Sequence, residues 1–194
     1  MSRPRVLGLY TDRIRLDRGP KAASSLHSPV PAPPQKITYG GVGYYRIHAP
    51  LTAAGYPVTG KPGRQLPPSF SDYLALFQRY DVLHMTRIEN PAEALMALSA
   101  RDIAGGRLII DCDDDIFHVD RLSPAYEKYK PGAPVVKLIK ELFRHCDALT
   151  VSRHKLAELY GELNPDVHVL PNACDPAKWD VEAGPRTDPD TIRV

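Results

Sequence analysis

The feature of the sequence that most constrains its fold is an alternation of short apolar runs with longer segments of helical periodicity. The apolar runs cover residues 6–10, 81–86, 107–111, 147–152 and 167–170. Strands that alternate with helices of about 10–15 residues are typical of βαβ units, whose right-handed crossovers make the strands parallel. The pattern therefore predicts an α/β domain in which helices pack on a parallel sheet.

Capping residues and prolines mark where the helices are expected to begin. Ser69 precedes one segment of helical periodicity, and Pro134 opens another. Asn90 followed by Pro91 combines a capping side chain with a proline at the first helical position. That helix is expected to end at Gly105, because glycine readily ends a helix.

Proline is unusually abundant in this chain. It accounts for 20 of the 194 residues, about twice its usual share. Residues 11–39, after the first expected strand, combine prolines with serines and disfavour both helix and strand. We expect a long loop there, inserted in a domain that spans residues 1–174. Residues 175–194 have no periodic apolar face and are expected to be a linker and the start of a second domain that is absent.

Composition and charge exclude several classes of protein. A formal net charge of +2 is too small for a dedicated nucleic-acid binder. A hydrophobic share of 43% with 25% charged residues is typical of soluble globular proteins. No apolar stretch approaches the roughly 18–20 residues of a membrane helix, and the start of the chain does not resemble a signal peptide. The cysteines are odd in number and lack metal-type spacing. We therefore expect a cytoplasmic protein without a transmembrane segment.

A glycine cluster lies between the first expected strand and the first expected helix. Gly40, Gly41 and Gly43 would let the backbone approach a ligand, and the helix N-terminus would offer free N–H groups to an anion. Arg46 follows the cluster and Arg87 follows a strand, so each could clamp a phosphate or a carboxylate. The cluster matches neither the dinucleotide-binding nor the P-loop pattern. A flexible turn is the alternative.

An acidic cluster follows the apolar run that ends at Asp111. Asp113, Asp114 and Asp115 then add three carboxylates, and mutual repulsion should make at least one resist ionisation. The carboxyl edge of a parallel sheet is where open α/β folds bind ligands. Three interpretations remain open here: a metal clamp for a nucleotide diphosphate, a general base, and a loop in which aspartates cap backbone amides.

Histidines extend this set of candidates. His118 lies in the loop beside the acidic residues and is a candidate catalytic group. His84 lies inside an expected strand, where a hydrogen-bonded core histidine is the more common outcome. The histidines and cysteines show no spacing typical of structural zinc. We therefore expect no structural zinc site.

Taken together, these segments resemble the N-terminal half of a GT-B-fold glycosyltransferase of the bacterial and phage type. Two segments carry most of the resemblance: DALTVS at residues 147–152 and VLPNACD at residues 169–175. The glycine segment at 40–46 and the acidic run at 109–117 appear in the matching order. The resemblance covers roughly residues 3–180, with the loop at 11–39 outside it.

The resemblance implies a Rossmann-like half-domain that handles the acceptor of a sugar transferred from a nucleotide sugar. It implies that Asp113, Asp114, Asp115 and His118 supply the catalytic groups. The implied substrate-binding residues are Gly40, Gly41, Gly43, Tyr44, Arg46, Arg87 and Asn172. No cofactor beyond the nucleotide sugar is implied, and metal is not expected to be required.

In enzymes of this type the nucleotide-sugar site and the paired glutamates of the retaining members belong to a second domain. We therefore expect this half to be inactive unless a donor-binding half or a larger assembly completes it. One alternative is a non-catalytic binding or structural module in a larger assembly, for example of a phage. Another is an unrelated α/β protein that binds a nucleotide or phosphate at the glycine cluster.

Overall fold

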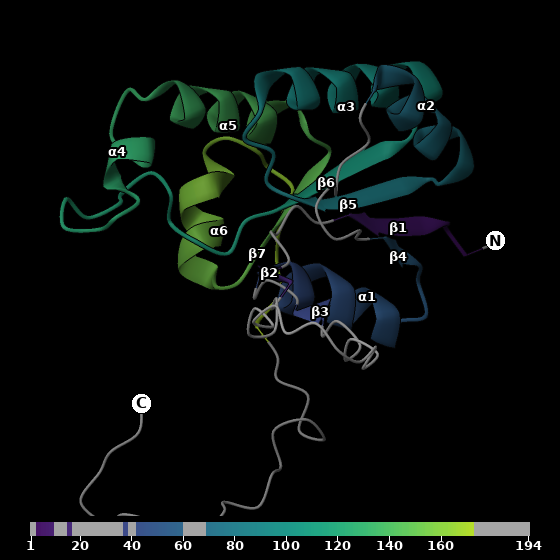
Figure 1. The fold of residues 1–194 in the computed structure, drawn as a ribbon, viewed down its shortest axis with the longest axis horizontal. Coiled ribbons are helices and arrows are strands. Elements are labelled where there is room, and N and C mark those ends of the chain that lie inside the picture. Colours follow the sequence, from purple (N-terminus) through teal and green to yellow (C-terminus); the bar gives the residue numbers. More distant parts are fainter. Residues whose placement is uncertain (1–2, 10–14, 17–36, 39–41, 60–68, 173–194) are drawn as a thin grey trace, which may run out of the picture.

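The computed structural model describes residues 3–9, 15–16, 37–38, 42–59 and 69–172. Gly40, Gly41 and the expected linker at 175–194 lie outside these residues, as does most of the proline-rich segment. The described chain folds around a six-stranded sheet in the order β4-β1-β5-β6-β7-β8 (Figure 1). Every pair of neighbouring strands in this sheet is parallel.

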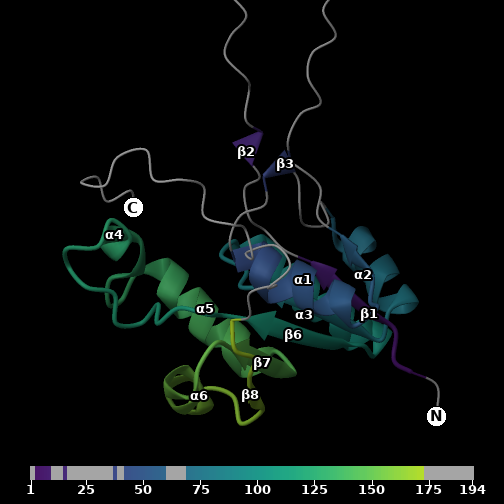
Figure 2. The same ribbon diagram turned by 90° about the horizontal axis from the view of Figure 1, so that it is seen from below.

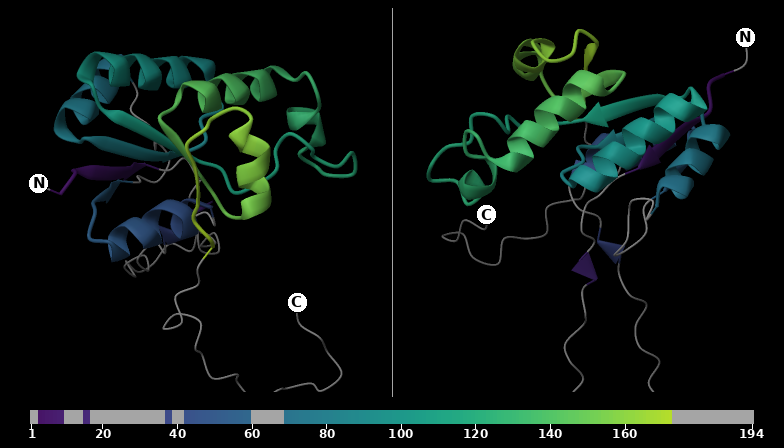
Figure 3. Two further views of the ribbon diagram at one scale, coloured as in Figure 1. Left: turned by 180° about the vertical axis from the view of Figure 1, so that it is seen from behind. Right: turned by 90° about the horizontal axis from the view of Figure 1, so that it is seen from above.

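The strands of the sheet are β1 (Val6–Leu9), β4 (Val58–Thr59), β5 (Val82–Thr86), β6 (Arg107–Asp111), β7 (Ala148–Val151) and β8 (Val167–Val169). Around it lie η1 (Gly43–His48), α1 (Ala49–Ala53), α2 (Phe70–Arg79), α3 (Pro91–Ala104), α4 (Tyr126–Tyr129), α5 (Pro134–His145) and α6 (His154–Gly161). Helices α2, α3 and α5 cover one face of the sheet, and η1 with α1 covers the other (Figure 3). The predicted α/β class with a Rossmann-like parallel sheet is confirmed.

The predicted helix boundaries follow from local hydrogen bonding. The Ser69 side chain accepts a hydrogen bond from the amide of Asp72 at the start of α2. The Asn90 side chain accepts hydrogen bonds from two amides in the first turn of α3. Gly105 ends α3 with φ of 75°, a left-handed conformation that suits glycine. Such caps satisfy the end groups that a helix leaves without partners.

Three short elements were not expected. Strand β4 pairs with β1 and extends the sheet by two residues. Strands β2 (Arg15–Leu16) and β3 (Ile37–Thr38) form an antiparallel pair outside the main sheet (Figure 2). The expectation of a strand-free loop over residues 11–39 is therefore wrong at these two places, neither of which contains proline. Segment η1 is a π-helix, a rare form often found at functional sites.

The core is continuous across the central strands. Leu83, Met85, Leu108 and Ile110 are fully buried in β5 and β6, as expected for parallel strands covered on both faces. Phe143 of α5 and Tyr160 of α6 pack edge to face with ring centroids 5.0 Å apart. None of the helices in the described ranges is both long and apolar enough to cross a membrane. Arg46, Thr86 and Asp111 are buried polar residues at the carboxyl edge of the sheet, whereas the buried Asn164 lies before β8.

Candidate functional site

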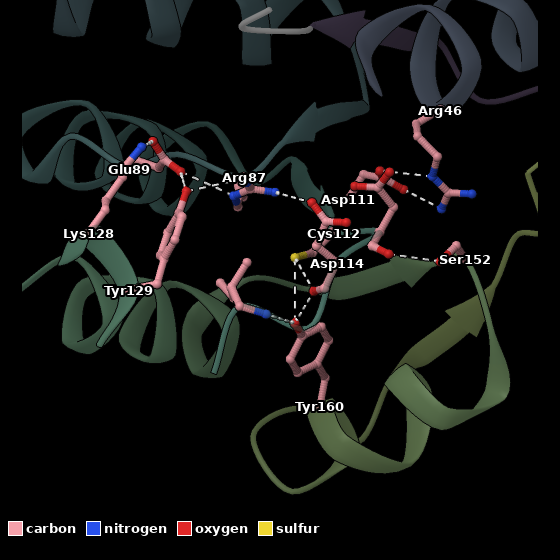
Figure 4. A network of polar contacts seen from close by, with 12 residues as sticks. Arg46, Arg87, Glu89, Asp111, Cys112, Asp114, Lys128, Tyr129, Ser152 and Tyr160 are labelled. Atoms are coloured by element: carbon pink, nitrogen blue, oxygen red, sulfur yellow. Dashed lines mark hydrogen bonds and ion pairs between the residues drawn. The ribbon is translucent and has the colours of Figure 1, made fainter. Parts of the chain in front are cut away.

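The carboxyl edge of the sheet carries the chemistry-bearing side chains. Strands β5 and β6 end at Thr86 and Asp111, and the parallel register places these two residues opposite each other. The loop after β6 then brings Asp114 to the same edge (Figure 4). The loop after β5 contributes Arg87, whose amide donates to the carbonyl of Asp111. The predicted gathering of these groups follows from strand direction alone.

Arg46 forms a buried ion pair with Asp111. Its Nη2 donates to Oδ1 of Asp111 at 2.6 Å and its Nε donates to Oδ2 at 3.1 Å. Its Nη1 donates to the carbonyl of Leu170 and to the side-chain oxygen of Asn172. The Arg46 side chain is only 1% exposed. Arg46 was expected to clamp a ligand, but its guanidinium is instead committed to groups of the protein, so it positions the edge.

A chain of hydrogen bonds continues from this ion pair into the sheet. The hydroxyl of Thr150 donates to Oδ1 of Asp111 at 2.6 Å and lies 2.9 Å from Nε2 of His84. Because the single hydroxyl proton serves the carboxylate, His84 must donate through Nε2. Burial, aided by the charge of Arg46, lowers the pKa of His84 to about 4. His84 is thus the hydrogen-bonded core histidine expected for a strand position.

The aspartates of the cluster have different environments, so the repulsion expected between them does not affect their pKa values equally. Burial raises the pKa of Asp111, although Arg46 and Thr150 oppose the effect. Burial also raises the pKa of Asp113, and the charges of Asp114 and Asp111 add to it. Oδ1 of Asp113 is buried and has no hydrogen-bond partner among the described residues. Asp113 is therefore the carboxyl group of the cluster best suited to take up a proton.

Asp115 and His118 form a closed turn. Oδ1 of Asp115 accepts hydrogen bonds from the amides of Phe117 and His118, each at 3.1 Å. The His118 ring lies 3.1 Å from the same carboxylate through Nδ1. This is the amide-capping arrangement that was one of the three interpretations of the cluster. It accounts for Asp115, and it leaves Nε2 of His118 directed away from that turn.

Tyr160 of α6 holds the acidic loop against the domain, a role that sequence reasoning missed. Its hydroxyl donates to the carbonyl of Asp114 and accepts from the amide of Ile116 at 3.3 Å. The Ser152 hydroxyl donates to the carbonyl of Asp113 at 2.9 Å. These long-range bonds leave no local sequence signal beyond a tyrosine on the apolar face of its helix. They fix the loop backbone, in which Asp114 and Asp115 are exposed and Asp113 is partly buried.

A hollow of about 600 Å³ lies between the acidic loop and α6. Its lining includes the side chains of Asp113, Asp114, Asp115, His118, Arg153 and Glu158. The predicted catalytic residues thus line one depression. Within the described ranges, no group of three or more His, Cys, Asp or Glu side chains is placed to hold a metal ion.

The glycine segment is described only from Val42 onward. Gly43 is buried at the start of η1, the helix from which Arg46 reaches Asp111. The Tyr44 ring stacks on His48 with ring centroids 5.5 Å apart and packs edge to face on Tyr45. The end of the glycine segment and the acidic cluster therefore belong to the same edge of the sheet.

No protein-family model and no curated protein matches the sequence. Among solved structures, the chain is similar to HepE of Anabaena, which was crystallised in complex with UDP-glucose. The TM-score is 0.41 and the sequence identity is 16% over 66% of this chain. The chain spans about a third of HepE, because the match covers 34% of that protein.

Proposed function

We propose that this chain is the acceptor-side half of a glycosyltransferase that uses a nucleotide sugar. The observation that carries the proposal is the half-buried Asp113, whose carboxyl group has a raised pKa and lines a hollow at the carboxyl edge of a parallel sheet. Ligands of open α/β folds bind at this edge. The sequence segments at 147–152 and 169–175, which resemble GT-B enzymes, support the same assignment.

The proposed reaction assigns a role to each group. A hydroxyl oxygen of the acceptor attacks the anomeric carbon of the donor sugar, and the bond from that carbon to the diphosphate oxygen breaks. Asp113 takes the hydroxyl proton, since a raised pKa makes its carboxylate a stronger base. The nucleoside diphosphate leaves with its electron pair, and the cation of Arg87 at the same edge favours that charge.

A second lobe completes this proposal. In the GT-B enzymes that the sequence resembles, the nucleotide is held by a second domain across a cleft. We assign the residues described here to the wall that binds the acceptor and carries the base. The domain boundary at residue 174 belongs to the same proposal. The Arg46 contacts to Leu170 and Asn172 anchor the backbone close to that boundary.

The direct test is a panel of nucleotide sugars added to the chain alone and to the chain supplied with a donor-binding half. We expect thermal stabilisation by one nucleotide sugar, and release of the matching nucleoside diphosphate once an acceptor and the donor-binding half are both present. Asp113→Asn should abolish release and retain stabilisation. Glu141→Gln, which removes an exposed carboxylate on α5, is the matched control. The absence of both stabilisation and release across the panel would overturn the proposal.

A further inference from the structure

The guanidinium of Arg87 is fixed on two of its three nitrogens. Its Nε donates to Glu89 at 3.2 Å and its Nη2 donates to the hydroxyl of Tyr129 at 3.2 Å. Tyr129 in turn donates to Glu89, and Lys128 forms an ion pair with the same carboxylate. The network joins the loop after β5 to α4 (Figure 4). These contacts set the plane of the guanidinium before any ligand arrives.

The third nitrogen, Nη1, has no hydrogen bond to any of the described residues. Nη1 lies 3.9 Å from Oδ2 of Asp114, which is beyond hydrogen-bond reach. Asp114 is 65% exposed, whereas Arg87 is only 21% exposed. Arg87 is therefore a largely buried cation with one donor edge open, and that edge faces a loosely held carboxylate.

The local charge balance also leaves Arg87 in need of a partner. Glu89 is shared between Lys128 and Arg87, and Tyr129 contributes a neutral hydroxyl. Hydrogen bonds from Lys128 and Tyr129 and the charge of Arg87 lower the pKa of Glu89, in opposition to its burial. The two cations thus share one strongly held anion. Asp114 supplies the second negative charge from a distance.

We propose that Arg87 is the receptor for a phosphoryl oxyanion of the ligand, and that Asp114 occupies its place in the free protein. Phosphate oxygens would bind the open Nη1 edge of an already oriented guanidinium, which suits arginine better than lysine. The ligand would displace Asp114 from Arg87. The released carboxylate also lines the hollow, so it becomes available to an acceptor hydroxyl.

This inference rests on the proposed function, because it names the charged group of the proposed substrate. It predicts that substitutions of Arg87 and Asp114 change the affinity for a phosphoryl anion in opposite directions. Loss of Arg87 should weaken binding of a phosphoryl anion, since the ligand loses its charged donor. Loss of the Asp114 charge should strengthen binding of the same anion, since its competitor is gone. A surface that merely attracts anions would not single out these two residues.

The test is calorimetric titration of the 194-residue chain with inorganic pyrophosphate. Arg87→Gln should raise Kd by at least about tenfold, as expected for a lost charge-assisted hydrogen bond. Asp114→Asn should lower Kd by about two- to fivefold, the range expected for an exposed ion pair. Arg144→Gln and Glu141→Gln remove paired, exposed charges of α5 and are the matched controls. Both controls should leave Kd unchanged.

Several results would overturn the inference. One is that Asp114→Asn leaves the Kd for pyrophosphate unchanged or raises it. This result can be obtained even if Arg87→Gln fails to fold. Another is a loss of binding in Arg153→Gln but not in Arg87→Gln, which would place the anion at the start of α6. Malonate binding as tightly as pyrophosphate would replace the phosphoryl group with a carboxylate.

The same variants separate this inference from the proposed function. Pyrophosphate binding needs no sugar transfer. If the Kd values follow the expected pattern but no nucleotide sugar is turned over, only the proposed transferase function is rejected. Turnover that is unaffected by Arg87→Gln would retract only the phosphoryl receptor.

Discussion

Replacement of Arg46 by methionine is the most informative perturbation of the buried polar edge. The substitution keeps an unbranched side chain of comparable length in η1 but removes the guanidinium. Asp111, whose side chain is 0% exposed, would then retain only the hydroxyl of Thr150 as a donor among the described residues. The carbonyl of Leu170 and the side chain of Asn172 would lose their Arg46 hydrogen bonds as well.

The expected cost in free energy of unfolding is about 4 kcal/mol. Removing one partner of a buried ion pair typically costs about 3–5 kcal/mol, because the other charge is left uncompensated. That loss is a large fraction of the roughly 5–15 kcal/mol that stabilises a domain. The double variant Arg46→Met/Asp111→Leu should lose only about 1 kcal/mol, since replacing both charges by apolar groups is often close to neutral. Urea unfolding of the unsubstituted chain and of the two variants, followed by circular dichroism, measures both losses.

The pH dependence of the single variant gives an independent check. Without Arg46, burial raises the pKa of Asp111 further above its unfolded value of about 4. A carboxyl whose pKa is higher in the folded state binds protons preferentially there, so it favours folding below the unfolded pKa and loses that contribution as pH rises. The penalty should therefore be smaller near pH 4 than near pH 7. A loss below about 1 kcal/mol at neutral pH, or a penalty that grows on acidification, would refute the reasoning.

Three further outcomes are expected. Gly8→Ala should lower the free energy of unfolding in urea by about 1–3 kcal/mol, because the added Cβ would lie 2.5 Å from a side-chain atom of α1 and 2.8 Å from one of η1. In the control Gly161→Ala the added Cβ has no atom within 4 Å, so this variant should not be destabilised. Tyr160→Phe should lower the free energy of unfolding by about 1–3 kcal/mol and speed amide hydrogen exchange in the acidic loop, because the buried amide of Ile116 loses its acceptor. Unchanged exchange would contradict the anchoring role of Tyr160. The His84 imidazole should titrate near pH 4 by NMR. Because its pKa is lower in the folded than in the unfolded state, it should contribute to a loss of stability as pH falls from about 6.5 towards 4. A titration near pH 6.5 would contradict its burial.

The order of elements could be predicted because local chemistry marks it. Ser69 and Asn90 cap their helices through contacts within one turn, and Gly105 adopts the left-handed conformation that ends α3. The carboxyl-edge position of the acidic cluster followed from strand direction. Strand β4 was missed because two residues carry no periodicity, and its pairing with β1 is set only in the folded chain.

The partners of the site residues could not be predicted in the same way. Arg46 and Asp111 lie 65 positions apart, and nothing local distinguishes an arginine that binds a ligand from one that binds a buried carboxylate. The only available signal was an aspartate that directly follows three apolar strand residues, since a buried carboxylate in a parallel sheet requires a partner. Likewise, no local pattern marked the roles of Tyr129 and Tyr160, whose hydroxyls organise Arg87 and the acidic loop.

Amide chemical-shift mapping of the isotopically labelled chain with nucleotide sugars tests the proposed glycosyl-transfer site most directly. The account predicts that one nucleotide sugar perturbs Arg87 and residues 113–118 at the carboxyl edge, while Arg5 and Tyr80, which line a separate hollow, stay unchanged. Perturbations confined to Arg5 and Tyr80 would contradict it.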